Sequence, residues 1–138
     1  MARVVVVDSG VLVAVLHERD AHHQWAQAHF RAVKPPFLTC EAVISESLFL
    51  LEGEPRAQEG LRGMLDRGVV KIDFSAETHL PDLLKLLRRY ADIPMSFADA
   101  CLVRMSERVT DTVTFTVDSD FKFYRRHGRQ MMPVLAPW

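Results

Sequence analysis

Four acidic residues of this chain could do chemistry together if the fold gathers them: Asp8, Glu46, Asp99 and Asp118. Carboxylates that cluster without cysteines or a histidine pair select hard cations with oxygen ligands, chiefly Mg²⁺ or Mn²⁺. Such a cation keeps several waters and takes phosphate oxygens as further ligands, which suits hydrolysis of a phosphodiester bond. Without a cation, the four charges would repel one another in a partly dry cleft.

Three of these acids also have a simpler explanation. Asp8 could cap the helix that follows it, because aspartate is a favoured N-cap residue. Asp99 stands three residues after Ser96, which is the spacing of a capping box. Glu46 falls among apolar residues on its helix, where a salt bridge or an edge position would satisfy its charge. For each residue taken alone, these explanations remain open.

Two β-branched runs predict the strands that position the first and last acids. Residues 4–7 are four consecutive valines, and residues 113–117 form a second run rich in β-branched residues. Runs of this kind are typical of central parallel strands that are buried on both faces. The first run ends at Asp8 and the second at Asp118. Because strands and helical segments alternate along the chain, we expect an α/β fold with a mainly parallel central sheet flanked by helices.

The other two acids are expected on helices that begin at the same edge of the sheet. Glu46 lies in the second turn of a helix predicted over 40–51, directly after a short strand over 37–39. Asp99 lies in the first turn of a helix that leads into the strand over 113–117. Helices that follow or precede parallel strands in this way start at the carboxyl edge, where such sheets bind ligands. The topology therefore predicts that all four acids meet there.

The remaining segments complete the alternation. The further predicted helices cover residues 10–16, 21–33, 55–68, 76–90 and 97–108, and the further strands cover residues 69–74 and 131–135. The last strand is expected at an edge of the sheet, near Pro133. Because the helix over 40–51 is apolar almost all round, we expect it to be buried.

Length and composition limit the class of protein. The 138 residues suit a single domain over 1–138. The formal net charge of −1 offers no basic excess, so any binding of nucleic acid must be local. Cys40 and Cys101 show no disulfide or metal spacing, which favours a reducing cytosol and a cytoplasmic protein. The apolar start is too short for a signal peptide, and no stretch is long enough for a membrane span.

Four motifs in order carry a resemblance to a known family. They are Val4-Val5-Val6-Val7-Asp8-Ser9-Gly10, a Glu46 expected to be buried, Met95-Ser96-Phe97-Ala98-Asp99-Ala100, and Phe115-Thr116-Val117-Asp118-Ser119-Asp120-Phe121. Together they resemble the PIN domain, and within it the VapC-type toxin ribonucleases of bacterial toxin–antitoxin pairs. The resemblance covers nearly the whole chain. It implies a PIN-like three-layer fold and a metal-dependent endoribonuclease that is often a homodimer.

The resemblance also implies roles for single residues. The catalytic and metal-binding acids that it carries over are Asp8, Glu46, Asp99 and Asp118. Ser9 matches a hydroxyl that supports the first acid, and Thr116 matches its counterpart before the fourth. Both Asp118 and Asp120 fit the last acidic position; we favour Asp118, with Asp120 as a helper or cap.

A toxin that cleaves RNA in the cytosol requires an inhibitor, so the expected partners are an RNA substrate and a small antitoxin. The acidic cleft lies between two apolar helices predicted over 10–16 and 40–51, an arrangement that suits an amphipathic segment laid in a groove. An arginine from that segment would pair well with the carboxylates. We therefore expect a disordered antitoxin tail that folds on binding.

Three other readings compete with this one. A phosphatase of the haloacid-dehalogenase type needs a second aspartate two residues after the first, where this chain has Gly10. A Toprim-like nuclease would use Asp118 and Asp120, but it leaves Glu46 and Asp99 unexplained. A non-catalytic PIN-like domain would bind nucleic acid or protein without cleaving it, and a metal titration would separate that class from an enzyme.

Overall fold

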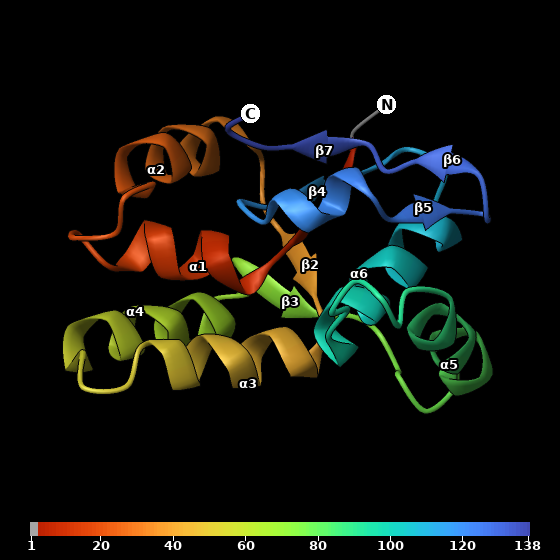
Figure 1. The fold of residues 1–138 in the computed structure, drawn as a ribbon. Helices are drawn as coiled ribbons and strands as arrows, with labels where there is room; N and C mark the ends of the chain where they lie inside the picture. Colours follow the sequence, from red (N-terminus) through yellow and green to blue (C-terminus); the bar gives the residue numbers. More distant parts are fainter. Residues whose placement is uncertain (1–2) are drawn as a thin grey trace.

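A computed structural model describes residues 3–138, and its centre is a five-stranded sheet (Figure 1). The strand order is β3-β2-β1-β4-β7, and every pairing in this sheet is parallel. The strands are β1 (Val4–Val7), β2 (Phe37–Thr39), β3 (Val70–Ile72), β4 (Thr112–Phe115) and β7 (Val134–Leu135). The predicted parallel α/β sheet is confirmed, with β7 at an edge as expected.

The pairing of β1 with β4 decides where the site lies. The two strands pair residue for residue, from Val4 opposite Thr112 to Val7 opposite Phe115. The backbone N–H of Asp8 then donates to the carbonyl of Phe115 at 3.0 Å. Because both strands end at the same level, the residues that follow them emerge side by side at the carboxyl edge of the sheet.

Helices cover the sheet on both sides and form its outer layers. They are α1 (Ser9–Leu16), α2 (His23–Ala32), α3 (Glu41–Leu50), α4 (Pro55–Asp66), α5 (Leu80–Arg89) and α6 (Phe97–Arg108). Helix α1 packs against α2, α3 and α4, which lie together on the left in Figure 1. Helix α6 packs against α5, which lies beside it on the right in Figure 1, and against β1 and β4 of the sheet. Within residues 3–138, no helix has the length and apolar character needed to cross a membrane.

Helix α3 departs from its predicted burial. Its buried residues are Val43, Ile44 and Ser47, whereas Phe49 is 70% exposed and Leu50 is 49% exposed. The helix packs on α1 and α6 through one face only. An apolar sequence on all sides predicts burial, but within the described chain no element is placed against the second face. The expectation that the whole helix over 40–51 is buried is therefore wrong.

A short hairpin after β4 was not predicted from the sequence. The chain forms a 3-10 turn, η1 (Ser119–Lys122), and then pairs β5 (Arg125–Arg126) antiparallel with β6 (Gln130–Met131). His127 and Gly128 in the turn both have positive φ angles, of 53° and 78°. The strand predicted over 131–135 is therefore divided, because Met131 belongs to β6 and only Val134 and Leu135 form β7. Strands of two residues are too short for periodicity to detect.

Candidate active site

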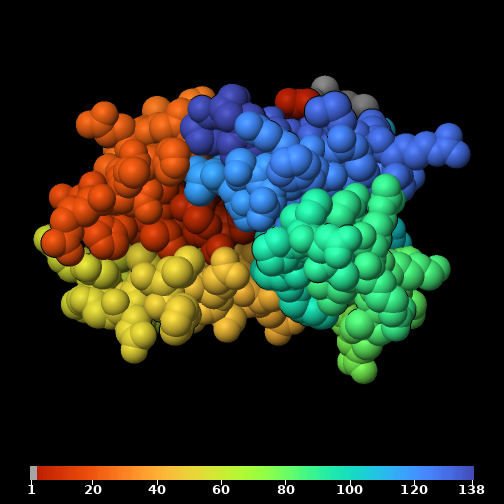
Figure 2. Space-filling view, viewed as in Figure 1, coloured from red at the N-terminus to blue at the C-terminus, as the bar shows by residue number. Residues whose placement is uncertain are grey.

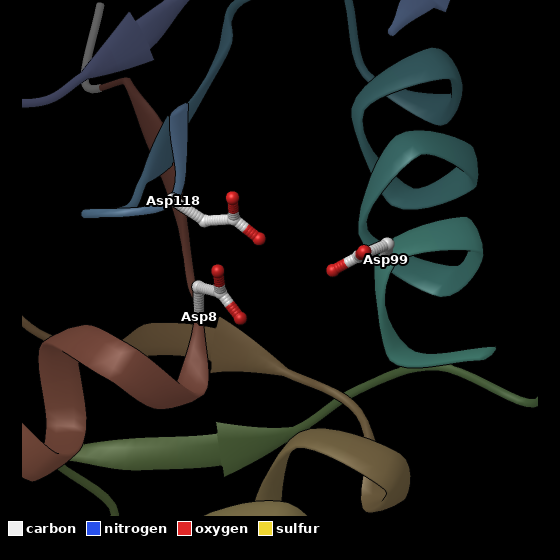
Figure 3. Close-up of side chains that lie close together, drawn as sticks. All are labelled: Asp8, Asp99 and Asp118. Atoms are coloured by element: carbon white, nitrogen blue, oxygen red, sulfur yellow. The ribbon is translucent and has the colours of Figure 1, made fainter. Parts of the chain in front are cut away.

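Three of the predicted acids meet at the carboxyl edge of the sheet. Carboxylate oxygens of Asp8, Asp99 and Asp118 all lie within 4.8 Å of one another (Figure 3). Asp8 directly follows β1 and Asp118 stands three residues after β4, while Asp99 faces them from the first turn of α6. Asp8 is 5% exposed and Asp99 is 7% exposed. The site therefore brings two buried carboxylates and one half-buried carboxylate together from three distant parts of the chain.

Two short hydrogen bonds fix the carboxylate of Asp8. The backbone N–H of Ser9 donates to Oδ1 at 2.7 Å, and the buried hydroxyl of Thr116 donates to Oδ2 at 2.8 Å. Asp8 is at the same time the N-cap of α1, so its capping role and its place in the cluster coexist. Each carboxylate oxygen has more than one acceptor direction, which leaves capacity for a further ligand.

Asp99 is held by a capping box and by one residue that sequence reasoning missed. Its backbone N–H donates to Oγ of Ser96 at 3.0 Å, and the backbone N–H of Ser96 donates to Oδ2 of Asp99 at 3.2 Å. The hydroxyl of Tyr124 donates to the same Oδ2 at 3.0 Å. A buried tyrosine needs a partner for its hydroxyl, which is the one signal in the sequence. Nothing in the sequence names Asp99 as that partner.

The structure places Asp118, rather than Asp120, in the cluster. Oδ1 of Asp118 accepts a hydrogen bond of 2.9 Å from the backbone N–H of Asp120, so that Asp118 caps η1. The backbone N–H of Asp118 donates in turn to the hydroxyl of Thr116 at 3.0 Å. The hydroxyl of Thr116 therefore hydrogen-bonds both to the carboxylate of Asp8 and to the backbone N–H of Asp118. Asp120 contributes its backbone N–H, which donates to the carboxylate of Asp118.

Glu46 is not buried, and it stands outside the group of three. Its side chain belongs to an exposed residue of α3, and its Oε1 accepts a hydrogen bond from the hydroxyl of Ser9. The same hydroxyl lies 3.5 Å from Oδ1 of Asp8. The predicted burial of Glu46 is wrong because α3 packs through its Val43 and Ile44 face, which leaves Glu46 at the rim. Ser9 nevertheless links Glu46 to the buried Asp8.

Burial and mutual repulsion shape the electrostatics of the cluster. Burial raises the pKa of Asp8 to about 7, and the charges of Asp99 and Asp118 add to the rise, against the hydrogen bonds from Thr116 and Ser9. Burial, followed by the charge of Asp118, also raises the pKa of Asp99 above its usual value. Among residues 3–138, no ion pair includes any of the three acids.

This donor set fits a divalent cation. Three carboxylates are the hard oxygen ligands that Mg²⁺ and Mn²⁺ prefer. A cation at their centre would replace repulsion by attraction and favour the ionised forms that burial opposes.

Residues 5–126 match the model of the PIN-domain family. This chain belongs to that family. The predicted family is thereby confirmed, and so is the three-layer fold. The structure of this PIN domain is similar to that of VapC20 from Mycobacterium tuberculosis, described as a sarcin-ricin loop cleaving toxin. The TM-score is 0.73, and the match has 21% identity over 84% of this chain and 91% of that chain. Among curated protein sequences, none matches this PIN domain.

Proposed function

We propose that this PIN domain is an endoribonuclease that hydrolyses RNA phosphodiester bonds with Mg²⁺ or Mn²⁺. The observation that carries the proposal is the cluster of Asp8, Asp99 and Asp118, whose oxygens lie within 4.8 Å of one another at the carboxyl edge of the sheet. Family membership supports nuclease chemistry at these positions. A bound divalent cation would supply Lewis-acid stabilisation of the charge that develops on the phosphate oxygens.

The residues around the cluster would then have distinct tasks. Asp8, Asp99 and Asp118 hold the cation, and their own hydrogen bonds fix their orientation before the substrate arrives. Glu46 is exposed and accepts a hydrogen bond from Ser9, whose hydroxyl lies 3.5 Å from Oδ1 of Asp8. From there its carboxylate can accept a hydrogen bond from the attacking water and help to orient it for displacement at phosphorus.

We further infer that the enzyme acts as the toxin of a toxin–antitoxin pair in the cytoplasm. VapC20, the structural relative, carries the description of a toxin, and the fold of this chain matches it over most of both chains. The proposed partners are RNA, a small antitoxin and a second copy of this chain. An arginine of the antitoxin is the natural counter-charge for a carboxylate cluster that pairs with no basic residue within the described chain.

The proposal is tested with the purified protein and RNA. Cleavage should require Mg²⁺ or Mn²⁺, stop on addition of EDTA, and be lost in Asp99→Asn, which removes a charge with little change of shape. Asp66→Asn is the matched control, because Asp66 is an exposed aspartate at the end of α4. Full activity of Asp99→Asn would refute the assignment. Metal-independent RNA binding without cleavage would favour a non-catalytic domain instead.

A further inference from the structure

An exposed cation–aromatic pair lies at the edge of the sheet that carries the acids. Nζ of Lys122 lies 5.1 Å from the centroid of the Trp138 ring. Trp138 is 44% exposed, and Lys122 is exposed as well. The exposed part of the Trp138 ring is available for stacking by a flat aromatic ligand. Neither residue takes part in the cluster of acids described above.

Lys122 is tied to the site through η1. Asp118 is the N-cap of this turn, and Lys122 is its last residue and its single basic residue. A 3-10 turn rises about 2 Å per residue, so the backbone of Lys122 is about 8 Å beyond that of Asp118 along the turn. A cation near the carboxylates would favour the approach of an anionic substrate, and Lys122 carries a positive charge on the turn that Asp118 caps.

Trp138 also lies beyond the carboxyl edge of the sheet, in the segment that follows β7. Strand β7 runs parallel to β4, and the backbone N–H of Thr116 donates to the carbonyl of Leu135 at 3.1 Å. The residues after Leu135 therefore leave the sheet at its carboxyl edge, as Asp118 does. In Figure 2, the indigo of the last residues borders the blue of the segment near residue 120. On the same face, dark red residues from the start of the chain lie in a hollow between the blue, teal and yellow segments.

We propose that Trp138 and Lys122 form a subsite for one unpaired nucleotide of the RNA, next to the bond that is cleaved. The base stacks on the indole of Trp138, and the ammonium of Lys122 contacts a neighbouring phosphate. Single-stranded RNA is bound in this way, through stacking on aromatic side chains combined with local positive charge. The near-neutral net charge of the chain requires such local contacts. The inference rests on the proposed ribonuclease function and identifies part of its substrate site.

Binding is measured first without cleavage, in EDTA. The chain has two tryptophans, Trp25 and Trp138. Trp25 packs edge-on against the Phe115 ring, so Trp25→Phe keeps an aromatic ring there and leaves Trp138 as the single fluorescent tryptophan. A single-stranded oligoribonucleotide should quench this fluorescence, and an RNA duplex of the same sequence should quench it far less. Equal or absent quenching with both RNAs would overturn the inference.

Kinetics with Mg²⁺ or Mn²⁺ then test the contribution to catalysis. Trp138→Ala should raise KM about tenfold with kcat nearly unchanged, because a stacking contact binds ground state and transition state alike. Trp138→Phe, which keeps an aromatic face, should recover most of that loss. Lys122→Gln should raise KM less and weaken its dependence on salt. Phe49→Ala is the control, since it removes a more exposed aromatic ring from α3.

The outcomes separate this inference from the proposed function. If the wild-type protein cleaves RNA but Trp138→Ala leaves KM unchanged, the subsite is wrong and the nuclease assignment stands. If the wild-type protein does not cleave, the nuclease assignment fails, while single-strand-specific quenching in EDTA would still support the RNA contact. A rise in KM that Trp138→Phe does not recover would point to a structural role and count against stacking.

Discussion

The hydroxyl of Tyr124 donates a hydrogen bond of 3.0 Å to Oδ2 of Asp99. This contact joins the segment after η1 to the first turn of α6, and it holds the one acid of the cluster that does not follow a strand. Tyr124 also packs edge-on against the rings of Tyr90 and Phe121, so its ring has little freedom to move. Burial and the charge of Asp99 raise the pKa of Tyr124 above its ordinary value, which keeps the hydroxyl protonated as a donor.

Loss of this hydroxyl should weaken metal binding more than it weakens the fold. Groups that orient a metal ligand typically contribute 10- to 100-fold in affinity or activity. We therefore expect Tyr124→Phe to raise the apparent Kd for Mn²⁺ about tenfold or more in a calorimetric titration, with a loss of about 1 kcal/mol in unfolding free energy. An unchanged Kd would show that Asp99 is held well enough by its capping box.

Asp8 should make the metal-free protein less stable as the pH rises. Its pKa is raised from 3.8 to about 7 in the folded state, so the folded protein binds the extra proton between these values. The unfolding free energy must then fall with rising pH across that window, by up to about 4 kcal/mol from this group. In EDTA, Asp8→Asn should gain stability relative to the wild type from pH 4 to pH 8. If chemical denaturation gives the same difference in unfolding free energy between Asp8→Asn and the wild type at every pH, the raised pKa of Asp8 is contradicted.

Divalent cations should stabilise the folded protein through the cluster. A ligand that binds the folded state alone contributes about 2.7 kcal/mol at a hundredfold excess over its Kd. For a domain of this size the melting temperature should rise by roughly 10 °C. The rise should largely vanish in Asp8→Asn and persist in Asp66→Asn. If both variants respond like the wild type, the ions act elsewhere.

Glu46→Gln should separate a catalytic role from a structural one. Because Glu46 is exposed, its replacement should change the unfolding free energy by no more than about 0.5 kcal/mol. If Glu46 orients the attacking water, kcat should fall at least about tenfold. Unchanged kcat would leave Glu46 as a hydrogen-bond acceptor for Ser9 alone. Glu41→Gln, in the first turn of the same helix, is the control.

Growth of a bacterial host reports on the toxin assignment. Expression of the wild-type chain alone should arrest growth, and Asp99→Asn should not. Co-expression of a small protein encoded beside this gene should restore growth. The complex of the two proteins should weaken at high salt, because the proposed contact pairs basic residues of the antitoxin with the carboxylate cluster of this chain. Normal growth with abundant wild-type protein and no partner would count against a toxin, though not against nuclease chemistry.

The strands and the edge they share could be predicted because local sequence determines them. The valine run before Asp8 and the run before Asp118 allow few arrangements other than central parallel strands, and their ends fix two of the acids. Asp99 could be placed at the same edge because helix direction follows from the alternation of elements. These inferences need no knowledge of which side chains touch.

The features that the sequence did not reveal depend on tertiary packing. A helical wheel shows which residues neighbour Glu46 on α3, but not which face of α3 meets α1 and α6, so the exposure of Glu46 and Phe49 was missed. The contact between Tyr124 and Asp99 joins residues 25 positions apart through the fold alone. The two-residue strands of the hairpin are too short to leave a pattern.

The pairing of β1 with β4 has a consequence for the order of events during synthesis. Thr116 and Asp8, whose side chains meet at 2.8 Å, are separated by 108 positions in the chain. A nascent chain that has emerged only as far as α5 possesses Asp8 and Glu46 but lacks both acids that complete the cluster. Contacts of such long range also form late and slowly in folding. If the chain is the toxin proposed above, the time in which its last third is made is an interval in which an antitoxin can already be present before the first complete acidic cluster forms.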